Sequence, residues 1–488
     1  MPQYHLAIDI GASSGRHILG SVRDSRLELE EVHRFDNRQE RRGGHDCWDL
    51  ENLRQGILDG LRACGRLGKI PATVGIDTWA VDFVLLDEND SLLGDAVAYR
   101  DSRTIGMDDE VNRLIPPEKL YAATGIQKQP FNTIYQLMAL KKQQPELLER
   151  ARSLLMLPDY FNFLLTGVKK QEYTNATSTG LVNAREKTWD MDIIRTLGYP
   201  ERLFGELSVP GTAVGGLRPE LREELGFDTV VVLPATHDTG SAFLAVPARD
   251  DEAVYLSSGT WSLLGVENTE PVTTEASRAQ NFTNEGGAWY RYRYLKNIMG
   301  LWMIQSVRRE LCGVDYVSGK RRAGWQLDTE AGERQWTFPD LIAQAQAAED
   351  FGSVVDVNDE GFLAPDSMIL AVQQHCRQTG QAVPETVGQL MQCVYRSLAV
   401  CYRDAVKELE KLTGKRYTSI NIVGGGCQDE YLDRMTARYC GMPVFAGPVE
   451  GTAIGNLMVQ MIHGGEFPSL QQARDAVKRS FDVREIEA

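Results

Sequence analysis

A glycine-rich turn near the N-terminus carries the first residues that suggest chemistry. Residues 6–10 are apolar except for one carboxylate, Asp9, and Gly11 and Gly15 bracket an Ala-Ser-Ser turn. Two extended runs around such a turn predict a hairpin, and its exposed backbone N–H groups can bind a polyphosphate. Arg16 adds a fixed positive charge, and a carboxylate beside phosphates is suited to holding Mg2+. An ordinary glycine-rich hairpin with an aspartate at a strand end is the alternative.

A second stretch, residues 253–265, repeats the order of strand, Ser/Gly/Thr turn and strand, with Thr260 in the turn. The two stretches begin at Ala7 and Ala253, close to half of the 488-residue chain apart. This spacing suggests a duplicated domain with a nucleotide bound between the two copies. A chance match of two short turns would give the same pattern.

A His-Asp pair follows another apolar run. Residues 230–233 predict a strand, and a helix of small residues is expected directly after His237, Asp238 and Thr239. Asp238 can accept a proton from a hydroxyl nucleophile, while His237 can orient the same substrate. An aspartate that only caps the helix is the alternative, but it leaves the adjacent histidine unexplained. The pattern therefore favours catalysis.

Residues 74–87 predict two short strands joined by a polar corner that contains Trp79, Ala80 and Asp82. A tryptophan beside a carboxylate can stack on a sugar while the acid accepts hydrogen bonds from the sugar hydroxyls. A core tryptophan with an aspartate that caps the turn is equally consistent with these residues. Ala80 places no long charged side chain in the corner.

Three further segments are suited to lining a cleft. Residues 420–423 predict a strand that leads into three glycines, including Gly425, and then into a helix, where bare backbone can contact phosphate or adenine. Residues 296–305 are expected to open a helix with Gln305 near the nucleotide. Residues 172–179 are rich in hydroxyl side chains.

Strands and helices must position these motifs. Residues 27–35 predict another strand of the first sheet, and Asp49 is expected to cap a helix with Leu53 and Ile57 on its apolar face. A long helix is expected over residues 387–412, ending at Gly414. Residues 313–360 show the weakest pattern and predict peripheral helix and loop.

Composition narrows the class of protein. The chain has 488 residues, of which 42% are hydrophobic and 25% charged, which is ordinary for a globular protein of two domains. A net charge of −16 argues against a nucleic-acid or anionic-membrane surface, although a local cleft can still bind an anion. No signal-type run or membrane-spanning segment is expected, which favours a cytoplasmic protein. The 8 cysteines lack metal-ligand spacing and predict free thiols.

Taken together, the chain resembles the FGGY carbohydrate kinases, a branch of the actin, heat-shock chaperone and hexokinase superfamily. The resemblance runs from the first hairpin to Asn456. The segments that carry it are DIGASSGR, GIDTWAVDFVLLD, AYRDSR, EYTNAT, HDTGSA, LSSGTWSLLG, TNEGG, LKNIMGLW and VGGGCQ. Cys427-Gln428, Gly455-Asn456 and Ala80 depart from the common family pattern, and Ala80 bears on which ketose is used.

The resemblance implies an α/β fold with two ribonuclease-H-like domains, residues 1–245 and 246–488, hinged around a nucleotide cleft. It implies ATP as phosphoryl donor, Mg2+ held by Asp9 and Asp238, and Asp238 as the base for the C1 hydroxyl of a ketose. The residues implied to contact ATP are Ala12, Ser13, Ser14, Gly15, Arg16, Thr260, Gln305 and Gly425. Those implied to face the sugar are Ala80, His237, Thr239 and Asn297.

The motifs are most similar to the branch that acts on L-rhamnulose. A kinase for another ketose, such as L-fuculose or xylulose, is one alternative. An actin-like or chaperone-like ATPase switch is another, but it would not need His237 and Asp238. The expected partner is a small-molecule ketose, with no nucleic acid and no membrane, and the sequence leaves a monomer and a homodimer equally open.

Overall fold

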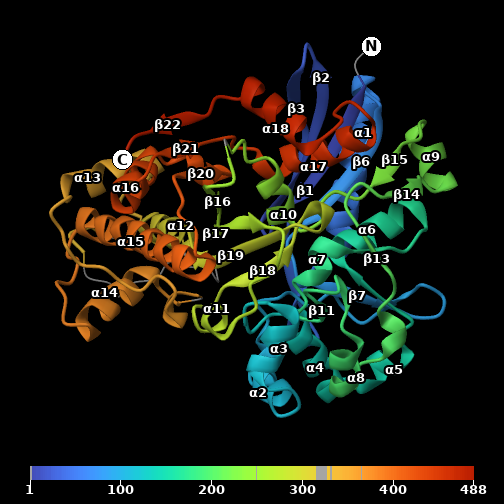
Figure 1. Ribbon diagram of the computed structural model, residues 1–488, viewed down its shortest axis with the longest axis horizontal. Coiled ribbons are helices and arrows are strands. Elements are labelled where there is room, and N and C mark those ends of the chain that lie inside the picture. The colour runs from blue at the N-terminus through green and yellow to red at the C-terminus, as the bar shows by residue number, and fades with distance from the viewer. Residues whose placement is uncertain (1–2, 249, 315–326, 330–331, 364) are drawn as a thin grey trace. The chain divides into compact units, whose positions relative to one another are not determined.

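The computed structural model describes residues 3–248, 250–314, 327–329, 332–363 and 365–488. The chain divides into two compact units (Figure 1). Unit 1 comprises Met1–Ala248, Val266–Leu295 and Glu450–Asp482; unit 2 comprises Arg249–Gly265, Lys296–Val449 and Val483–Ala488. The expected domain boundary at residue 245 stays a prediction, because unit 1 also includes two segments from the second half of the chain.

The main sheet of unit 1 has the strand order β14-β15-β6-β1-β2-β3. Its strands are β1 (Tyr4–Ile10), β2 (Ser14–Arg23), β3 (Arg26–Asp36), β6 (Pro71–Thr78), β14 (Ala213–Gly216) and β15 (Val230–Val232). Strands β1, β2 and β3 are antiparallel neighbours, whereas β6 runs parallel to both β1 and β15. The carboxyl ends of β1, β6 and β15 therefore point the same way, toward the motifs that follow them.

Helices cover both faces of this sheet (Figure 1). Along β1, Leu6, Ile8 and Ile10 belong to a core cluster shared with α1 (Leu50–Leu67) and α6 (Leu157–Thr166). Ala7 on the opposite face packs with α17 (Gly451–His463) and α18 (Leu470–Ser480). This alternation puts Asp9 on the same face as Ala7, because side chains on a strand point to opposite faces in turn.

Further elements complete unit 1. The helices are α2 (Met107–Asn112), α3 (Pro117–Thr124), α4 (Thr133–Gln143), α5 (Pro145–Arg150), α7 (Tyr173–Thr177), α8 (Met191–Leu197), α9 (Pro219–Leu225), α10 (Asp238–Leu244) and α11 (Glu275–Ala279). The strands are β4 (Gln39–Arg42), β5 (His45–Trp48), β7 (Phe83–Leu86), β8 (Leu92–Leu93), β9 (Ser153–Met156), β10 (Gln171–Glu172), β11 (Val182–Asn183), β12 (Thr188–Trp189), β13 (Leu207–Ser208) and β18 (Thr283–Gly286).

Unit 2 is built around its own strands and a long helix. Parallel β16 (Ala253–Ser258), β20 (Ser419–Val423) and β21 (Val444–Ala446) are flanked by β17 (Trp261–Asn268) and β22 (Arg484–Ile486). Strand β19 (Tyr292–Met299) begins in unit 1 and ends in unit 2. The helices are α12 (Trp302–Leu311), α13 (Phe338–Ala347), α14 (Met368–Gln378), α15 (Val387–Thr413) and α16 (Glu430–Cys440).

Most of the predicted elements are confirmed. Asp49 caps α1 by accepting the Asn52 backbone N–H at 3.0 Å. Helix α15 ends at Gly414, which adopts a left-handed conformation. The weak region 313–360 contains α13, while residues 315–326 and 330–331 of that prediction lie outside the described residues.

The prediction of a helix beginning at residue 296 is wrong. Residues 296–299 complete β19, and α12 begins only at Trp302. Gly300 lies so close to β17 that an added Cβ would stand 2.7 Å from the Ser262 backbone nitrogen. The chain therefore stays extended beside β17 until it has passed this contact.

The described cysteines and helices add two findings. All eight cysteines carry free thiols, as predicted. Among the described helices, none has the length and apolar character needed to cross a bilayer.

Helix α1 approaches the sheet closely at Gly60. A Cβ at this position would stand 2.0 Å from the His17 ring. His17 is fully buried, and burial lowers its pKa to about 3, so the ring is neutral. Because His17 follows Arg16 on β2, this contact helps to fix the hairpin that carries the predicted phosphate site.

We expect Gly60→Ala to lower the free energy of unfolding by about 1–3 kcal/mol, because a methyl group must displace a packed ring. Gly65→Ala on the same helix is the matched control, since its nearest neighbour, Phe227, lies 3.4 Å from the added Cβ. There the higher helix propensity of alanine should keep or raise stability by up to about 1 kcal/mol. Urea unfolding followed by tryptophan fluorescence checks both; equal midpoints for the two variants would contradict the packing argument.

Candidate active site

Two aspartates lie side by side at the carboxyl ends of β1 and β6. The parallel register pairs Asp9 with Asp77. Asp77 is fully buried, and burial together with the Asp9 charge raises its pKa well above the ordinary range. The Asn456 amide of α17 donates to one Asp77 oxygen at 2.5 Å, while the other oxygen has no hydrogen-bond partner. This pair concentrates negative charge at one edge of the sheet.

Asp238 adds a third carboxylate at the first residue of α10. Burial, and then the charge of Asp9, raises the pKa of Asp238 to about 7. The Thr239 backbone N–H donates to Asp238 Oδ1 at 2.6 Å, and the Thr239 hydroxyl donates to the same oxygen at 3.1 Å. The N-cap position belongs to His237, so helix capping does not account for Asp238. The second carboxylate oxygen is left to other partners.

Arg16 balances part of this charge. Its Nε and Nη2 donate to Asp9 Oδ2 at 2.9 and 2.8 Å, and its Nη1 lies 2.6 Å from Glu450 Oε2. Asp9 and Arg16 face each other across the β1–β2 pair. The hairpin tip beyond them, Ala12 and Ser13, is exposed. The first hairpin therefore has the predicted form, with its turn accessible and its arginine held by two carboxylates.

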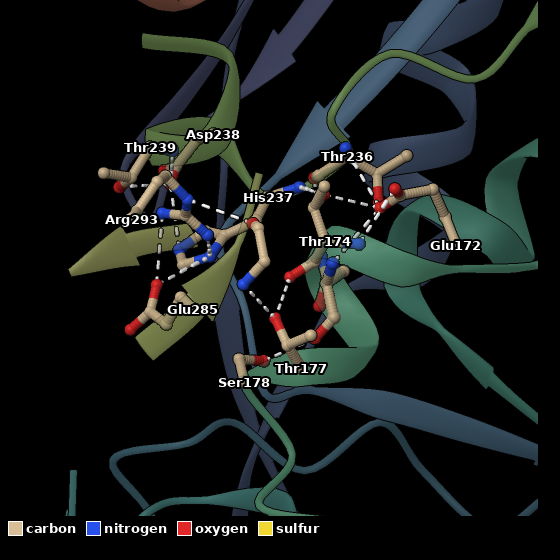
Figure 2. A network of polar contacts seen from close by, with 12 residues as sticks. Glu172, Thr174, Thr177, Ser178, Thr236, His237, Asp238, Thr239, Glu285 and Arg293 are labelled. Carbon is tan, nitrogen blue, oxygen red and sulfur yellow. Dashed lines mark hydrogen bonds and ion pairs between the residues drawn. The ribbon is translucent and has the colours of Figure 1, made fainter. Parts of the chain in front are cut away.

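His237 lies in a buried charged network (Figure 2). Arg293 Nη2 is 3.0 Å from His237 Nδ1, and Glu285 Oε2 is 3.3 Å from the same nitrogen. Burial and the Arg293 charge lower the pKa of His237 well below its ordinary value, so the imidazole is neutral. His237 Nε2 lies 3.5 Å from Asp238 Oδ1. The ring thus stands between a guanidinium and the candidate base.

The hydroxyl-rich segment holds the backbone that carries His237 (Figure 2). Glu172, fully buried, accepts hydrogen bonds from the hydroxyls of Thr174 at 2.6 Å and Thr236 at 2.7 Å. It also accepts backbone N–H groups at the start of α7. Thr177 accepts the Gly286 backbone N–H at 2.8 Å. This segment acts through hydrogen bonds to the chain itself, which the prediction of a cleft lining did not include.

Unit 2 brings its own predicted segments together. Within the β16–β17 hairpin, Gly259 accepts the Leu301 N–H and Thr260 accepts the Trp302 N–H, both at 3.1 Å, so α12 starts on this turn. Gly424 has a left-handed φ of 89°, and a Cβ on Gly426 would collide with the Ser258 side chain. Thr260, the beginning of the Gln305 helix and the triple glycine thus converge within one unit.

Models of the FGGY family of carbohydrate kinases match this chain twice. The N-terminal domain model covers residues 4–245, and the C-terminal domain model covers residues 254–463. The chain belongs to the FGGY family of carbohydrate kinases.

Individual relatives agree with this family. A rhamnulokinase from Oceanobacillus iheyensis is 50% identical over 483 residues, covering 99% of this chain and 98% of the relative. A rhamnulokinase from Halalkalibacterium halodurans is 50% identical over 481 residues, covering 99% and 98%. The crystal structure of a gluconate kinase from Lactobacillus acidophilus matches with a TM-score of 0.80 at 16% identity, covering 100% of this chain and 94% of that chain.

These findings confirm the expected two-domain α/β fold of an FGGY kinase and the expected enzyme class. An actin-like or chaperone-like ATPase switch, which we had kept as an alternative, is set aside because the family consists of carbohydrate kinases. A carbohydrate kinase acts on a small-molecule sugar, which agrees with the expected type of partner.

In this FGGY kinase, the Trp79 corner is a packed part of the core. Asp82 accepts the indole N–H groups of Trp48 at 2.6 Å and Trp79 at 2.9 Å, and the Gln136 amide at 3.1 Å. Trp79 is only 6% exposed, and its ring lies 4.2 Å from that of Trp48. Of the two interpretations that the sequence left open, these contacts favour a core tryptophan with a hydrogen-bonded aspartate.

The predicted site residues fall into two groups. Unit 1 holds Asp9, Ala12, Ser13, Ser14, Gly15, Arg16, Ala80, His237, Asp238 and Thr239, whereas unit 2 holds Thr260, Asn297, Gln305 and Gly425. Asn297 lies on β19 and not on a helix. Packing within the protein also requires a glycine at position 15, since a Cβ on Gly15 would stand 2.2 Å from the Phe35 ring.

Sequence reasoning missed four charged or polar residues of the unit 1 site. They are Asp77, Glu285, Arg293 and Glu450, each in contact with a predicted residue or close enough to shift its pKa. Arg293 had a visible signal, because it is a charged residue in an otherwise aromatic and aliphatic stretch, residues 292–295. Asp77 was visible as a carboxylate inside an apolar strand.

Proposed function

We propose that this protein transfers the γ-phosphoryl group of ATP to the C1 hydroxyl of L-rhamnulose. The observation that carries the proposal is the 50% identity with curated rhamnulokinases over 99% of the chain. Substrate changes within a kinase family usually accompany changes in the residues around the sugar, and identity at this level over the full length argues against them. Kinases for L-fuculose or xylulose are the alternative.

Asp238 is the proposed general base. A base that takes a proton from a hydroxyl works best when its pKa lies near the working pH. Burial and the neighbouring Asp9 charge raise the pKa of Asp238 to about 7, and Thr239 holds one of its oxygens by two hydrogen bonds. In the proposal the other oxygen accepts the C1 hydroxyl proton as the sugar oxygen attacks the γ-phosphorus.

The unit 1 carboxylates are suited to Mg2+. The carboxylates of Asp9, Asp77 and Asp238 repel one another. One buried Asp77 oxygen also has no hydrogen-bond partner. A hard cation would therefore offset an existing excess of negative charge. The described residues contain no preformed cluster of three or more metal-ligating side chains. We propose that Asp9 and Asp238 hold the ion together with water and phosphate oxygens, and its charge would offset that of the phosphates.

For ATP we propose contacts in both units. In unit 1 these are the hairpin residues Ala12, Ser13, Ser14, Gly15 and Arg16; in unit 2 they are Thr260, Gln305 and Gly425. Among the three consecutive glycines, Gly425 is the one for which packing within the protein gives no reason for a glycine. Gly424 needs its left-handed backbone and Gly426 needs room beside Ser258, but a Cβ on Gly425 would meet no atom within 4 Å. A ligand that approaches the backbone closely would explain the glycine.

We expect Asp238→Asn to reduce ketose phosphorylation by about 10²- to 10⁴-fold, the usual contribution of a general base. The amide has the same shape but cannot accept the proton. Coupled ADP-release assays, with circular dichroism and ATP-analogue binding as controls for folding, check this. Near-normal turnover of a well-folded variant would mean that Asp238 is not the base.

We expect Gly425→Ala to raise the KM for ATP while leaving the unfolding midpoint unchanged. Gly426→Ala is the comparison, because there the Cβ would stand 1.9 Å from the Ser258 hydroxyl oxygen and should destabilise the protein. Steady-state kinetics at varied ATP and thermal unfolding separate the two effects. An unchanged KM for ATP in Gly425→Ala would remove Gly425 from the nucleotide site.

We expect L-rhamnulose to have a higher kcat/KM than L-fuculose, D-xylulose and fructose. Polar groups such as His237 and Asn297, arranged for one hydroxyl pattern, are left unpaired by the wrong epimer. A site that accepts the methyl group of a 6-deoxy sugar rejects an added hydroxyl only by roughly 10²-fold, so weak side activities are expected. A panel of ketoses in one coupled assay decides this. Equal or higher kcat/KM for L-fuculose or D-xylulose would contradict L-rhamnulose as the substrate, while the assignment to the FGGY family would still hold.

A further inference from the structure

Arg293 is a buried cation whose guanidinium is fixed on three sides (Figure 2). The residue is only 1% exposed. Its Nε donates to the Gly286 carbonyl at 3.1 Å, its Nη1 lies 3.1 Å from Glu285 Oε2, and its Nη2 lies 3.0 Å from His237 Nδ1. Glu285 and Arg293 are direct partners in the antiparallel β18–β19 pair. The sheet register therefore determines where the guanidinium points.

This geometry decides which nitrogen of His237 carries the proton. A guanidinium has only donors, so Nδ1 at 3.0 Å from Nη2 must be the acceptor. A proton on Nδ1, directed to Glu285, would place two N–H groups against each other in a buried site. With Nδ1 as an acceptor, the ring carries its proton on Nε2. That nitrogen is 3.5 Å from Asp238 Oδ1, too far for a strong hydrogen bond, so the N–H is available to an incoming oxygen.

We propose that Arg293, held by Glu285, is a positioning residue that fixes His237 as an Nε2–H donor, and that the site thereby selects sugars that present an accepting oxygen to His237. This inference rests on the proposed function, in which His237 faces the ketose. The chain assigns opposite roles to two adjacent residues: His237 donates to the sugar, while Asp238 accepts its proton. Nothing in the motif His-Asp-Thr-Gly alone distinguishes the two tautomers.

The kinetic test replaces Arg293 by Met, which has a similar length but no donor, and by Lys, which keeps the charge. We expect Arg293→Met to raise the KM for the ketose about 10- to 100-fold, because the ring no longer has a fixed donor nitrogen. The KM for ATP should change far less, and Arg293→Lys should recover most of the loss. An unchanged ketose KM in Arg293→Met would overturn the proposal.

Arg474→Met is the matched control. Arg474 is also buried in unit 1, where it donates to the Phe243 and Leu244 carbonyls at 3.0 Å and pairs with Glu267 at 2.9 Å. It thus holds the carboxyl end of α10 through contacts that do not involve His237. We expect this variant to lose stability while keeping the ketose KM of the wild type. A rise in ketose KM as large as that of Arg293→Met would reduce the role of Arg293 to general packing and overturn the proposal.

The tautomer is measured directly by nitrogen-15 NMR of histidine-labelled full-length protein. The chain has 7 histidines, and the His237 signal is assigned by its loss in His237→Leu. We expect a protonated Nε2 and an unprotonated Nδ1 in the wild type, and a mixture of tautomers in Arg293→Met. A protonated Nδ1 in the wild type would overturn the proposal. This measurement needs no sugar, so a wild type that phosphorylates no ketose would reject the proposed function while the tautomer is still decided.

A double-mutant cycle tests whether Arg293 affects the ketose KM through His237. In the His237→Leu background, Arg293→Met should have little further effect on the ketose KM, because its action passes through the ring. Full additivity of the two substitutions would show that Arg293 acts independently of His237 and would overturn the proposal.

Discussion

The structure of unit 1 depends on holding two buried carboxylates, Asp9 and Asp77, and the partly exposed Asp238 at one edge of a sheet. Leu6, Ile8 and Ile10 must face α1 and α6, and this fixes the side on which Asp9 stands. The parallel register then sets Asp77 directly beside it. A slip by one residue would relieve the repulsion, but it would also turn Leu6, Ile8 and Ile10 away from α1 and α6. Burial of the strand therefore stabilises an arrangement that its charges oppose.

Compensating groups come from segments far apart in the chain. The hairpin supplies Arg16, α17 supplies Asn456, and β19 supplies Arg293. The segments that contain Asn456 and Arg293, residues 450–482 and 266–295, belong to unit 1. The predicted boundary at residue 245 followed the repeated hairpins and stays a prediction. The Asn456 amide leaves the other Asp77 oxygen without a hydrogen-bond partner, which agrees with the proposed Mg2+ site.

Local patterns predicted much of the fold but only part of the site. The hairpin, the strand before His237, the capped helix after Asp49 and the long helix α15 each follow from the residues that form them. The role of Arg293 could not be predicted in this way, because it depends on the pairing of β18 with β19. Asp82 shows the opposite case: from the sequence this carboxylate could equally contact a sugar or belong to the core, and Trp48, 34 residues earlier on β5, donates its indole N–H to it. Partners distant in sequence decide what a polar residue does.

The arrangement of His237 and Asp238 shows how one short segment provides both a donor and an acceptor. The two side chains are adjacent in the chain, but different neighbours form hydrogen bonds with each of them. Thr239 gives Asp238 two donors and so favours a carboxylate that accepts, while Arg293 gives His237 a donor at Nδ1 and so leaves a donor at Nε2. These orientations exist before any sugar binds, which spares the reaction the free energy of arranging them. The charge that fixes the imidazole also lowers the pKa of Asp238, the proposed base, against the effect of burial and of Asp9. The same guanidinium thus serves orientation and charge balance, and this is why it must be buried within the site and cannot be replaced by a solvent-exposed cation.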